Sequence, residues 1–215
     1  KGALSGRRVL VSAGTSREGL DAVRVITNLS SGLMGFELAR EAYARGAEVI
    51  LVTGPTTLDP PYGVDVVRID STEELQSAIS SHLKVADVLV MAAAPSDYRP
   101  TNKSAEKRAR KDGSLGLELE PTPDVLESTL SDRPERCFCV GFALETGDGL
   151  KRAREKMTQK QLDMVVYNRA DQNGSGFEVE TNQVILITDS EEEELPLMTK
   201  SEVAAKILDA VEARV

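Results

Sequence analysis

Short, almost entirely apolar runs alternate with amphipathic stretches along this chain. Residues 9–13 form the first apolar run, and residues 32–46 then carry apolar side chains at a helical spacing that stops at Gly46. Apolar runs without polar alternation are typical of parallel strands that are covered on both faces. The repeated strand–helix pattern therefore predicts a single α/β domain over residues 1–215, with a mostly parallel sheet flanked by helices.

The remaining elements follow from the same pattern and from end signals. Strands are expected at 47–54, 64–70, 86–95, 117–120, 136–144 and 163–167, and helices at 72–83, 123–131, 148–161 and 200–213. Ser71 with Glu74 predicts a capping box, and Thr122 before Pro123 predicts a capped helix start. Residues 182–188 and 194–198 predict a C-terminal β-hairpin across an acidic turn, and an exposed hairpin of this kind could pair with a second copy.

Two long polar stretches remain, at 14–30 and 96–116, and both are expected to be loops. The second is basic and is expected to be a flexible lid loop, because mobile cations suit a triphosphate on which charge develops during reaction. Its basic residues are Lys107, Arg108, Arg110 and Lys111.

The charge balance and the apolar content limit the kinds of partner. The formal net charge is −9, which disfavours general binding to nucleic acid, since phosphate backbones must be neutralised by Lys and Arg. No apolar run reaches the length of about 18 residues that a membrane span requires. We therefore expect no nucleic-acid and no membrane partner. The chain starts at Lys1 rather than Met, which indicates a domain excised from a longer chain.

Cysteine and histidine usage narrows the chemistry further. Cys137 and Cys139 would point to the same face of a strand, so they are expected to be free core thiols in a reducing, cytoplasmic setting. His82 is the single histidine, which makes histidine metal sites and histidine-based acyl-transfer triads improbable.

The first candidate site lies where the loop at 14–30 meets the following helix. Asn28, Ser30, Ser31 and Gly32 place small and amide side chains at that helix start. Free backbone N–H groups and the helix dipole at such a start suit a phosphate or carboxylate. We therefore expect an anionic substrate there.

The second candidate site gathers charges at the carboxyl ends of later strands, where ligands of parallel sheets bind. Asp97 follows a buried strand and could bind a nucleotide or Mg²⁺. Lys156 and Lys160 are four residues apart, so they share a helix face and could hold consecutive phosphates, although a solvated face is the simpler reading for such a pair alone. Phe142 ends another strand and could cover a base, although a core position is equally typical of phenylalanine.

The chain as a whole resembles the bacterial phosphopantothenoylcysteine synthetases, which commonly form the C-terminal half of a bifunctional flavoprotein of coenzyme A biosynthesis. The resemblance lies in Ser12–Glu18, Asp21–Gly35, Val52–Pro55, Ala92–Arg99, Glu106 with Lys107, Thr122–Val125, Val140–Thr146, Lys156 with Lys160, and Asn168. It implies a Rossmann-like sheet and a ligase that activates 4′-phosphopantothenate with CTP as an acyl-cytidylate. Cysteine then attacks, and CMP and pyrophosphate are the other products.

The resemblance also implies roles for individual residues. Asn28 and Lys107 are expected to be catalytic, the first orienting the substrate carbonyl and the second covering the triphosphate. Substrate binding is expected from Arg24, Asn28, Ser30, Ser31 and Gly32, and CTP binding from Ala93, Asp97, Lys107, Thr122, Pro123, Asp124, Val125, Phe142, Lys156 and Lys160. Asp97 is the expected ligand of Mg²⁺. The resemblance further implies a homodimer, with FMN confined to a decarboxylase domain that would precede residue 1.

Three other functions are compatible with parts of the pattern. The same ligase could use ATP, as eukaryotic relatives of this family do. An NAD(P)-dependent reductase could use the same kind of sheet, but no Gly-x-Gly-x-x-Gly follows the first strand and no phosphate-binding Gly-x4-Gly-Lys motif occurs. A non-catalytic nucleotide-binding or dimerisation module would be distinguished by its lack of turnover.

Overall fold

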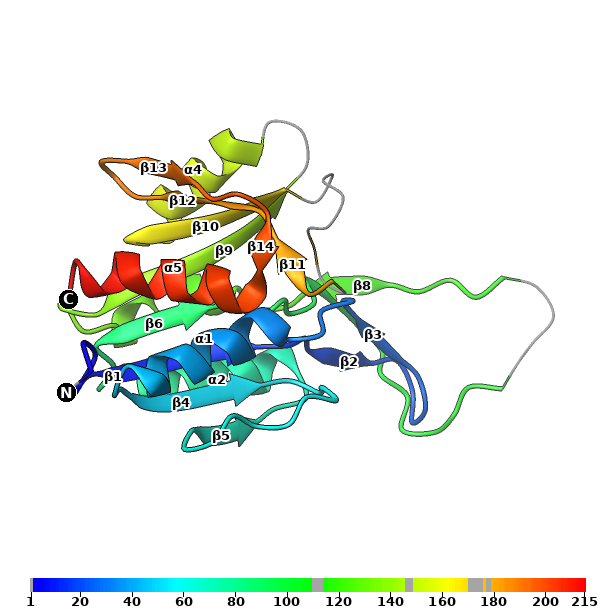
Figure 1. The fold of residues 1–215 in the computed structure, drawn as a ribbon. Helices are drawn as coiled ribbons and strands as arrows, with labels where there is room; N and C mark the ends of the chain where they lie inside the picture. Colours follow the sequence, from blue (N-terminus) through cyan, green and yellow to red (C-terminus); the bar gives the residue numbers. More distant parts are fainter. Residues whose placement is uncertain (1, 110–113, 146–148, 170–175, 177–178) are drawn as a thin grey trace.

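The computed structural model describes residues 2–109, 114–145, 149–169, 176 and 179–215. Within these residues, eight strands form the central sheet in the order β13-β12-β10-β9-β6-β1-β4-β5 (Figure 1). They are β1 (Arg8–Ala13), β4 (Glu48–Thr53), β5 (Asp65–Arg68), β6 (Val88–Met91), β9 (Phe138–Glu145), β10 (Met164–Arg169), β12 (Val184–Ile187) and β13 (Glu192–Glu194).

The sheet is parallel from β5 to β10, and β12 and β13 are added antiparallel at one edge. This confirms the expected mostly parallel sheet and the C-terminal hairpin. The hairpin register differs from the prediction, because Glu192–Glu194 form β13 itself and Thr188 and Glu191 close the turn. The chain leaves β1 towards β4 on one side and returns to β6 on the other, so the strand order reverses between β1 and β6. Ligands of such sheets bind at this switch point.

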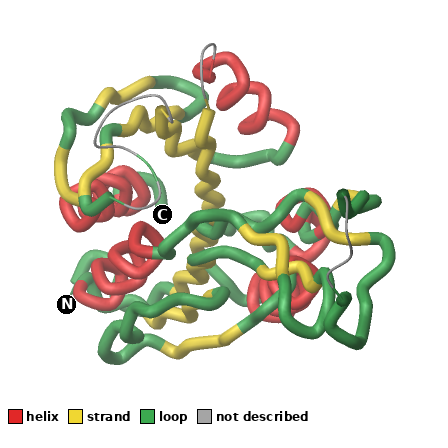
Figure 2. Tube along the Cα trace, turned by 90° about the vertical axis from the view of Figure 1, so that its right-hand side faces the viewer, coloured by secondary structure: helices red, strands yellow, loops and turns green. Residues whose placement is uncertain are grey.

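Helices cover both faces of the sheet, as Figure 2 shows with the sheet seen from its end. One face carries α1 (Leu33–Ala44) and α5 (Lys200–Glu212), and the other carries α2 (Thr72–Leu83), α3 (Val125–Ser128), the 3₁₀ turn η1 (Leu130–Asp132) and α4 (Gly149–Gln159). A hydrophobic core lies on each face of the sheet, and successive side chains of a buried strand point into one core and then the other. In β1, Val9 and Val11 pack towards α1 and α5, and Leu10 packs towards α2. This is why the strands are apolar along their whole length.

Two helix ends are stabilised by hydrogen-bonding motifs formed by residues close in the sequence. Gly46, at φ +90°, ends α1 with hydrogen bonds from Gly46 N–H to Tyr43 O and from Ala47 N–H to Ala42 O, a Schellman motif. Thr199 and Glu202 form a complete capping box on α5.

Two predicted helix starts need correction. Ser71 caps α2 by accepting from Glu74 N–H, but the Glu74 carboxylate accepts from Asp70 N–H, so the capping box is only half formed. The helix expected from Pro123 begins at Val125 instead, with Asp124 rather than Thr122 as its N-cap. Asp124 is the N-cap because its carboxylate accepts a hydrogen bond from the Glu127 N–H at 3.0 Å, whereas the Thr122 hydroxyl donates to Ser96 O.

Both stretches expected to be loops contain short hairpins. β2 (Arg17–Gly19) pairs with β3 (Val25–Thr27), and β7 (Tyr98–Pro100) pairs with β8 (Leu119–Pro121). We call residues 17–27 and 98–121 together the arm, which extends beyond the carboxyl edge of the sheet in Figure 1. Arg110 and Lys111, expected on the lid, lie outside the described residues. A third short pair joins β11 (Thr181–Asn182) to β14 (Met198–Thr199).

Candidate functional site

A cavity of about 470 Å³ lies over the carboxyl ends of β6, β9 and β10, beside the start of α1. The reversal of strand order places it there, because loops leave β1 and β6 in opposite directions. Of the residues expected to form the site, all but two line this cavity: Asn28, Ser30, Ser31, Gly32, Ala93, Asp97, Thr122, Pro123, Asp124, Val125, Phe142, Lys156 and Lys160. The two half-sites anticipated from separate stretches of sequence therefore form one continuous space.

The start of α1 forms one side of the cavity. Gly32 is its N-cap, at φ +86°, and a Cβ there would lie 3.1 Å from the backbone N of Gly14. Both the left-handed conformation and this close approach require glycine. Gly32 has no side chain with which to cap the helix, and Ser31 Oγ accepts a long hydrogen bond, 3.4 Å, from the first N–H of the helix, that of Leu33. The first turn therefore presents its backbone N–H groups and positive dipole end to the cavity, which suits an anion.

Asn28 links this side of the cavity to the turn after β6. Its Nδ2 donates to Pro95 O at 2.9 Å and to Ala94 O at 3.2 Å, and its backbone N–H donates to Thr15 Oγ1. Both amide hydrogens are therefore used in holding the turn. The atom that remains to meet a ligand is Oδ1, which accepts hydrogen bonds.

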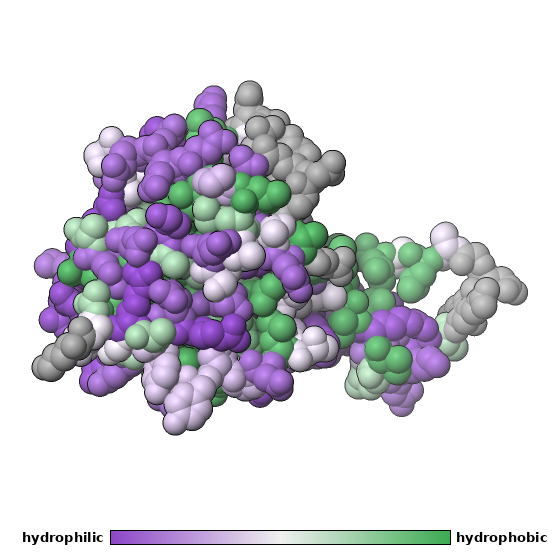
Figure 3. All heavy atoms as spheres, in the orientation of Figure 1, coloured by the Kyte–Doolittle hydropathy of each residue, from purple (hydrophilic) through white to green (hydrophobic). Residues whose placement is uncertain are grey.

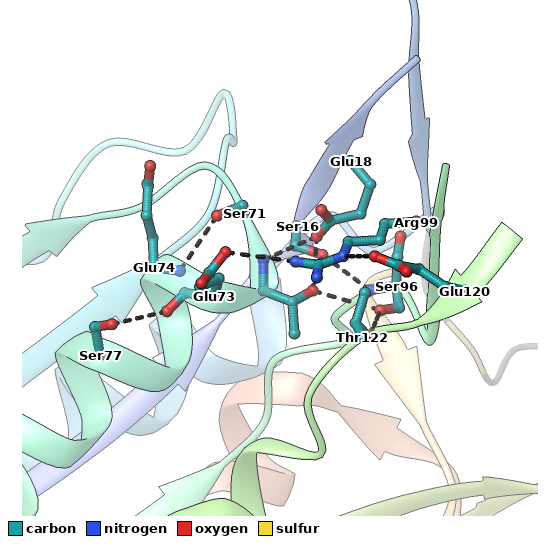
Figure 4. A network of polar contacts seen from close by, with 11 residues as sticks. Ser16, Glu18, Ser71, Glu73, Glu74, Ser77, Ser96, Arg99, Glu120 and Thr122 are labelled. Atoms are coloured by element: carbon teal, nitrogen blue, oxygen red, sulfur yellow. Dashed lines mark hydrogen bonds and ion pairs between the residues drawn. The ribbon is translucent and has the colours of Figure 1, made fainter. Parts of the chain in front are cut away.

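A buried polar network fixes the same turn from beneath (Figure 4). Thr72 Oγ1 and the Thr72 N–H both donate to Glu18 Oε1 at 2.8 Å, and Ser16 Oγ lies 2.8 Å from Thr72 Oγ1. Ser96 N–H donates to Ser16 Oγ, and Thr122 Oγ1 donates to Ser96 O at 2.6 Å. The network thus ties β2, α2 and the end of β8 to the cavity wall.

Removal of the Thr72 hydroxyl tests this network. We expect Thr72→Val to lower the free energy of unfolding by about 1–3 kcal/mol, because Glu18 loses a hydrogen bond and the Ser16 hydroxyl loses its acceptor. Ser77→Ala is the matched control, since Ser77 lies on the exposed side of the same helix and its hydroxyl bonds to Glu73 O. Urea denaturation monitored by circular dichroism measures both variants. Equal stability of the two would contradict the proposed importance of the network.

Lys156, on α4, forms the opposite side of the cavity. Its Nζ donates to Phe142 O at 2.6 Å, which directs the ammonium to the strand end. Burial lowers the pKa of Lys156, and the nearest carboxylates only partly offset that effect. A partly desolvated cation gains more from a bound phosphate than a solvated one does. Phe142 itself is partly buried, packing against the α1–α5 core while it lines the cavity.

Lys160 is held differently, by two carboxylates. Its Nζ lies 2.9 Å from Asp124 Oδ2 and 2.7 Å from Glu127 Oε2. Burial works to lower its pKa, but these two partners raise it overall. Burial likewise works to raise the pKa of Asp124, while the Glu127 N–H and Lys160 hold it below its ordinary value. Lys160 is therefore already neutralised, and Lys156 is the better-placed phosphate cation.

The expected metal ligand, Asp97, is exposed at the cavity edge. No cluster of three or more His, Cys, Asp or Glu side chains that could hold a metal occurs among the described residues. That arrangement fits Mg²⁺, which is usually bound through one or two carboxylates together with substrate phosphates and water. A metal that arrives with a nucleotide would therefore find its protein ligand in Asp97.

Two expected site residues do not line the cavity. Arg24 lies in the arm, where it pairs with Asp21 at 3.0 Å and donates to Arg108 O. Lys107 is exposed on the arm. The family resemblance placed both residues in the site, but the β2–β3 and β7–β8 pairings carry them away from the strand ends.

The structure adds cavity residues that the sequence reasoning did not select. Ser96, Asn182 and Lys200 are almost fully buried and line the cavity, together with Asn168 at the end of β10. Ser96 and Asn168 lie at strand ends and within the motifs of the family resemblance, but no role was predicted for either of them. Asn182 and Lys200 carry no sequence signal, because β11 and the start of α5 reach the cavity only through tertiary packing.

The comparisons with known proteins agree with this architecture. The family model described as "DNA/pantothenate metabolism flavoprotein C-terminal domain" matches residues 4–215. The chain belongs to this family. It is 38% identical over 212 residues to the coenzyme A biosynthesis bifunctional protein CoaBC of Bacillus subtilis (strain 168), covering 98% of the chain and 52% of that protein. The corresponding protein of Mycobacterium tuberculosis (strain ATCC 25618 / H37Rv) is 41% identical over 220 residues, covering 97% and 52%.

This chain thus spans about half the length of these curated relatives. Among solved structures, the C-terminal domain of a CoaBC protein is similar, with a TM-score of 0.84, 38% identity and coverage of 99% of this chain and 97% of that one. A Cab2 mutant solved as a complex with phosphopantothenate-cysteine has the same fold at 18% identity, with a TM-score of 0.78 and coverage of 96% and 86%.

These findings confirm the family resemblance and the Rossmann-like fold that the motifs indicated. The prediction that Cys137 and Cys139 are free core thiols is also confirmed, since both are buried and form no disulfide. Among the described residues, no helix combines the length and the apolar content that crossing a membrane would need.

Proposed function

We propose that this chain is a phosphopantothenate–cysteine ligase that uses CTP. One observation carries the proposal: a single cavity joins a helix start with a glycine N-cap, suited to an acid substrate, to a partly desolvated lysine, suited to a nucleotide phosphate. Family membership and 38% identity to the CoaBC C-terminal domain structure support the same reaction. A ligase of this kind must bring two anions together, and these groups offset their repulsion.

The reaction has two steps. The carboxylate of 4′-phosphopantothenate attacks the α-phosphorus of CTP, forming an acyl-cytidylate and releasing pyrophosphate. The amine of cysteine then attacks the acyl carbon, an amide bond forms, and CMP leaves with the electron pair of the broken C–O bond. Neither step needs a histidine base, which agrees with a chain whose single histidine, His82, lies at the far end of α2.

The described residues divide the work between them. Ser30, Ser31 and Gly32 present the start of α1 to the acid substrate, and Asn28 Oδ1 accepts a hydrogen bond from it or from the incoming amine. Lys156, assisted by Lys160, stabilises charge on the nucleotide phosphates. The nucleotide side is completed by Ala93, Asp97, Thr122, Pro123, Asp124, Val125 and Phe142, all of which line the cavity.

Asp97 would hold Mg²⁺ at the cavity edge. When bound, the metal would neutralise phosphate charge and aid departure of pyrophosphate. FMN has no role in this chain under the proposal. We assign it to a decarboxylase domain outside the chain, in keeping with the family description as a flavoprotein.

Pyrophosphate release is the direct test of the proposed activity. We expect release that requires both CTP and 4′-phosphopantothenate, with amide formation once cysteine is added. Release with ATP but not CTP would overturn the nucleotide assignment and leave the ATP-using ligase. Absence of release together with saturable NADPH binding would favour the reductase, which the structure disfavours because α1 does not follow β1 directly.

The lid role of Lys107 stays a prediction, and a rate measurement tests it. We expect Lys107→Ala to lower turnover about 100-fold, the scale observed when a charge-stabilising donor is removed. The reason is that the arm would bring this exposed cation over the triphosphate. Lys103→Ala is the control on the same segment, because the side chain of Lys103 packs against Gly19. Unchanged turnover in Lys107→Ala would remove Lys107 from the catalytic groups.

We further propose a homodimer, formed through the arm rather than the C-terminal hairpin. Pairing through β13 would set Glu192–Glu194 against the same residues of a second copy, and like charges destabilise cross-strand pairs. The arm instead exposes Val25, Tyr98 and Leu119, and Figure 3 shows its apolar surface.

Light scattering tests the dimer. We expect a dimer for the unmodified chain and a monomer for Val25→Asp with Leu119→Asp. A dimer that survives this double substitution would exclude the arm as its interface.

A further inference from the structure

Two buried carboxamide oxygens in the cavity wall have no hydrogen-bond partner. Asn182 is 2% exposed, and across the described ranges neither its Oδ1 nor the Oδ1 of Asn168 accepts a hydrogen bond. Buried polar atoms are nearly always satisfied, because an unpaired one costs the full desolvation of the group. Both residues line the cavity, so the two unpaired acceptors belong to the wall of a space that a ligand can fill.

A buried lysine lies beside these acceptors. β-sheet register connects the three residues: Asn168 pairs with Val184, two residues after Asn182, and Asn182 pairs with Met198, two residues before Lys200. Lys200 is 4% exposed and lines the same cavity. Its Nζ donates to Gly176 O at 2.9 Å, and its positive charge attracts an anion that enters the cavity.

Asn168, Asn182 and Lys200 lie in the half of the cavity that we assign to the acid substrate. Asn182 and Lys200 come from β11 and α5, on the same face of the sheet as α1, so they lie on the side of Gly32 and Met34. Lys156 belongs to α4 on the opposite face. The three residues therefore adjoin the half of the cavity assigned to the acid substrate rather than the half assigned to the nucleotide.

The chemistry of the group selects its ligand. Two acceptor oxygens require N–H or O–H donors, and an ammonium requires an anion. A phosphate would satisfy Lys200 but would face the two carbonyl oxygens with its own oxygens, leaving them unpaired. The α-amino and α-carboxylate groups of an amino acid supply donors and an anion two bonds apart, which matches the whole set.

We propose that Asn168, Asn182 and Lys200 bind the α-amino and α-carboxylate groups of the cysteine substrate. This inference rests on the proposed ligase function, and it names the place from which the amine attacks. The carboxamides hold the amine end and Lys200 holds the carboxylate, so the subsite selects amino acids over simple amines.

Substitution of Asn182 by leucine tests the amine half. Leucine is close in size and removes the unsatisfied oxygen, so the melting temperature should be unchanged or higher. We expect the KM for cysteine to rise roughly tenfold or more, which is the loss of one hydrogen bond to a charged group. Pyrophosphate release measured without cysteine should stay within about twofold of the unmodified chain. A rise in the KM for phosphopantothenate, with the KM for cysteine unchanged, would overturn the assignment in favour of the acid substrate.

Substitution of Lys200 by methionine tests the carboxylate half, with cysteamine as a probe that lacks the carboxylate. The unmodified chain should prefer cysteine to cysteamine in kcat/KM, and Lys200→Met should abolish that preference by slowing cysteine alone. Lys206→Met is the control, because Lys206 is exposed on the same helix. An unchanged preference in Lys200→Met would contradict the role of Lys200.

Binding of isotope-labelled cysteine, followed by NMR in the presence of CMP, separates this inference from the proposed function. Binding that is lost in Asn182→Leu supports the subsite even if no pyrophosphate is released, a result that would reject the ligase alone. Pyrophosphate release with cysteine binding unaffected by Asn182→Leu would reject the subsite and leave the ligase intact.

Discussion

Replacement of Lys156 by methionine is expected to lower CTP-dependent turnover by about 100-fold or more, the scale seen when a preorganised charge-stabilising group is removed. Of the two α4 lysines at the cavity, Lys156 is the less compensated: its Nζ bonds to a carbonyl oxygen, Phe142 O, whereas Lys160 already pairs with Asp124 and Glu127. A phosphate that enters the cavity therefore gains most from Lys156. Steady-state rates at saturating CTP measure the effect.

The same helix supplies two comparisons. Lys160→Met should cost less than Lys156→Met, because the charge of Lys160 is already offset by Asp124 and Glu127 and so contributes less to binding of a phosphate. Lys151→Met should leave turnover unchanged, since Lys151 is exposed and pairs only with Glu155 within the helix. A larger effect at Lys160 than at Lys156 would reverse the assignment of the phosphate cation.

The lowered pKa of Lys156 adds a pH dependence. Burial holds this pKa below the ordinary value of 10.5, so the ammonium is lost as pH rises through the lowered pKa. Affinity for CTP should therefore fall in that alkaline range, and Lys156→Arg should abolish the fall because arginine stays protonated. The folding stability of the unliganded protein should change with pH in the opposite direction. Between the lowered pKa of Lys156 and 10.5, the unfolded state binds more protons than the folded state. The free energy of unfolding should therefore rise with pH in this range, relative to that of Lys156→Met.

Replacement of Asn28 by aspartate is expected to damage the second chemical step more than the first. Asn28 gives both amide hydrogens to Ala94 O and Pro95 O, and a carboxylate there would face two carbonyl oxygens without a donor. Residue 28 should then shift relative to the Ala94–Pro95 turn, and with it the oxygen that accepts a hydrogen bond from the incoming amine. We expect amide formation to slow about 100-fold, the scale of a misplaced reacting group, while pyrophosphate release slows less.

Asn28→Ala separates the two roles of this side chain. Alanine removes the hydrogen bonds without adding repulsion, so it should be less harmful than aspartate in both steps. Rapid-quench measurement of pyrophosphate and amide distinguishes the steps. Equal, negligible effects of both substitutions would remove Asn28 from the site.

The order of elements was predictable because each strand is buried on both faces and needs an apolar sequence throughout. The α1 end at Gly46 and the Thr199 cap were also predictable, since their signals act over a few residues. The start of α3 was not, because Thr122 is drawn into the buried network by Ser96 O. A strand at 117–120 was predicted and overlaps β8, but its partner β7 and the hairpin of β2 and β3 were missed, because these strands are too short to show alternation.

The site residues that were predictable are likewise those marked by nearby sequence, and the others depend on tertiary packing. Asn28 to Gly32 and Asp97 were predictable, because each lies at a strand end or a helix start in the sequence. Lys156 and Lys160 were predictable because their four-residue spacing places them on one helix face. Asn182 and Lys200 depend on β11 pairing with β14 and on α5 packing beside α1, which no local pattern encodes. Arg24 and Lys107 were placed in the site by the family resemblance, whereas the chain pairing carries them into the arm.

Isotope transfer tests the central claim most directly. If 4′-phosphopantothenate labelled with ¹⁸O in its carboxylate is converted with CTP and cysteine, the proposed attack on the α-phosphorus leaves one labelled oxygen in CMP. We predict that label in CMP and none in pyrophosphate. Label found in pyrophosphate or inorganic phosphate, or unlabelled CMP after amide formation, would contradict activation through an acyl-cytidylate.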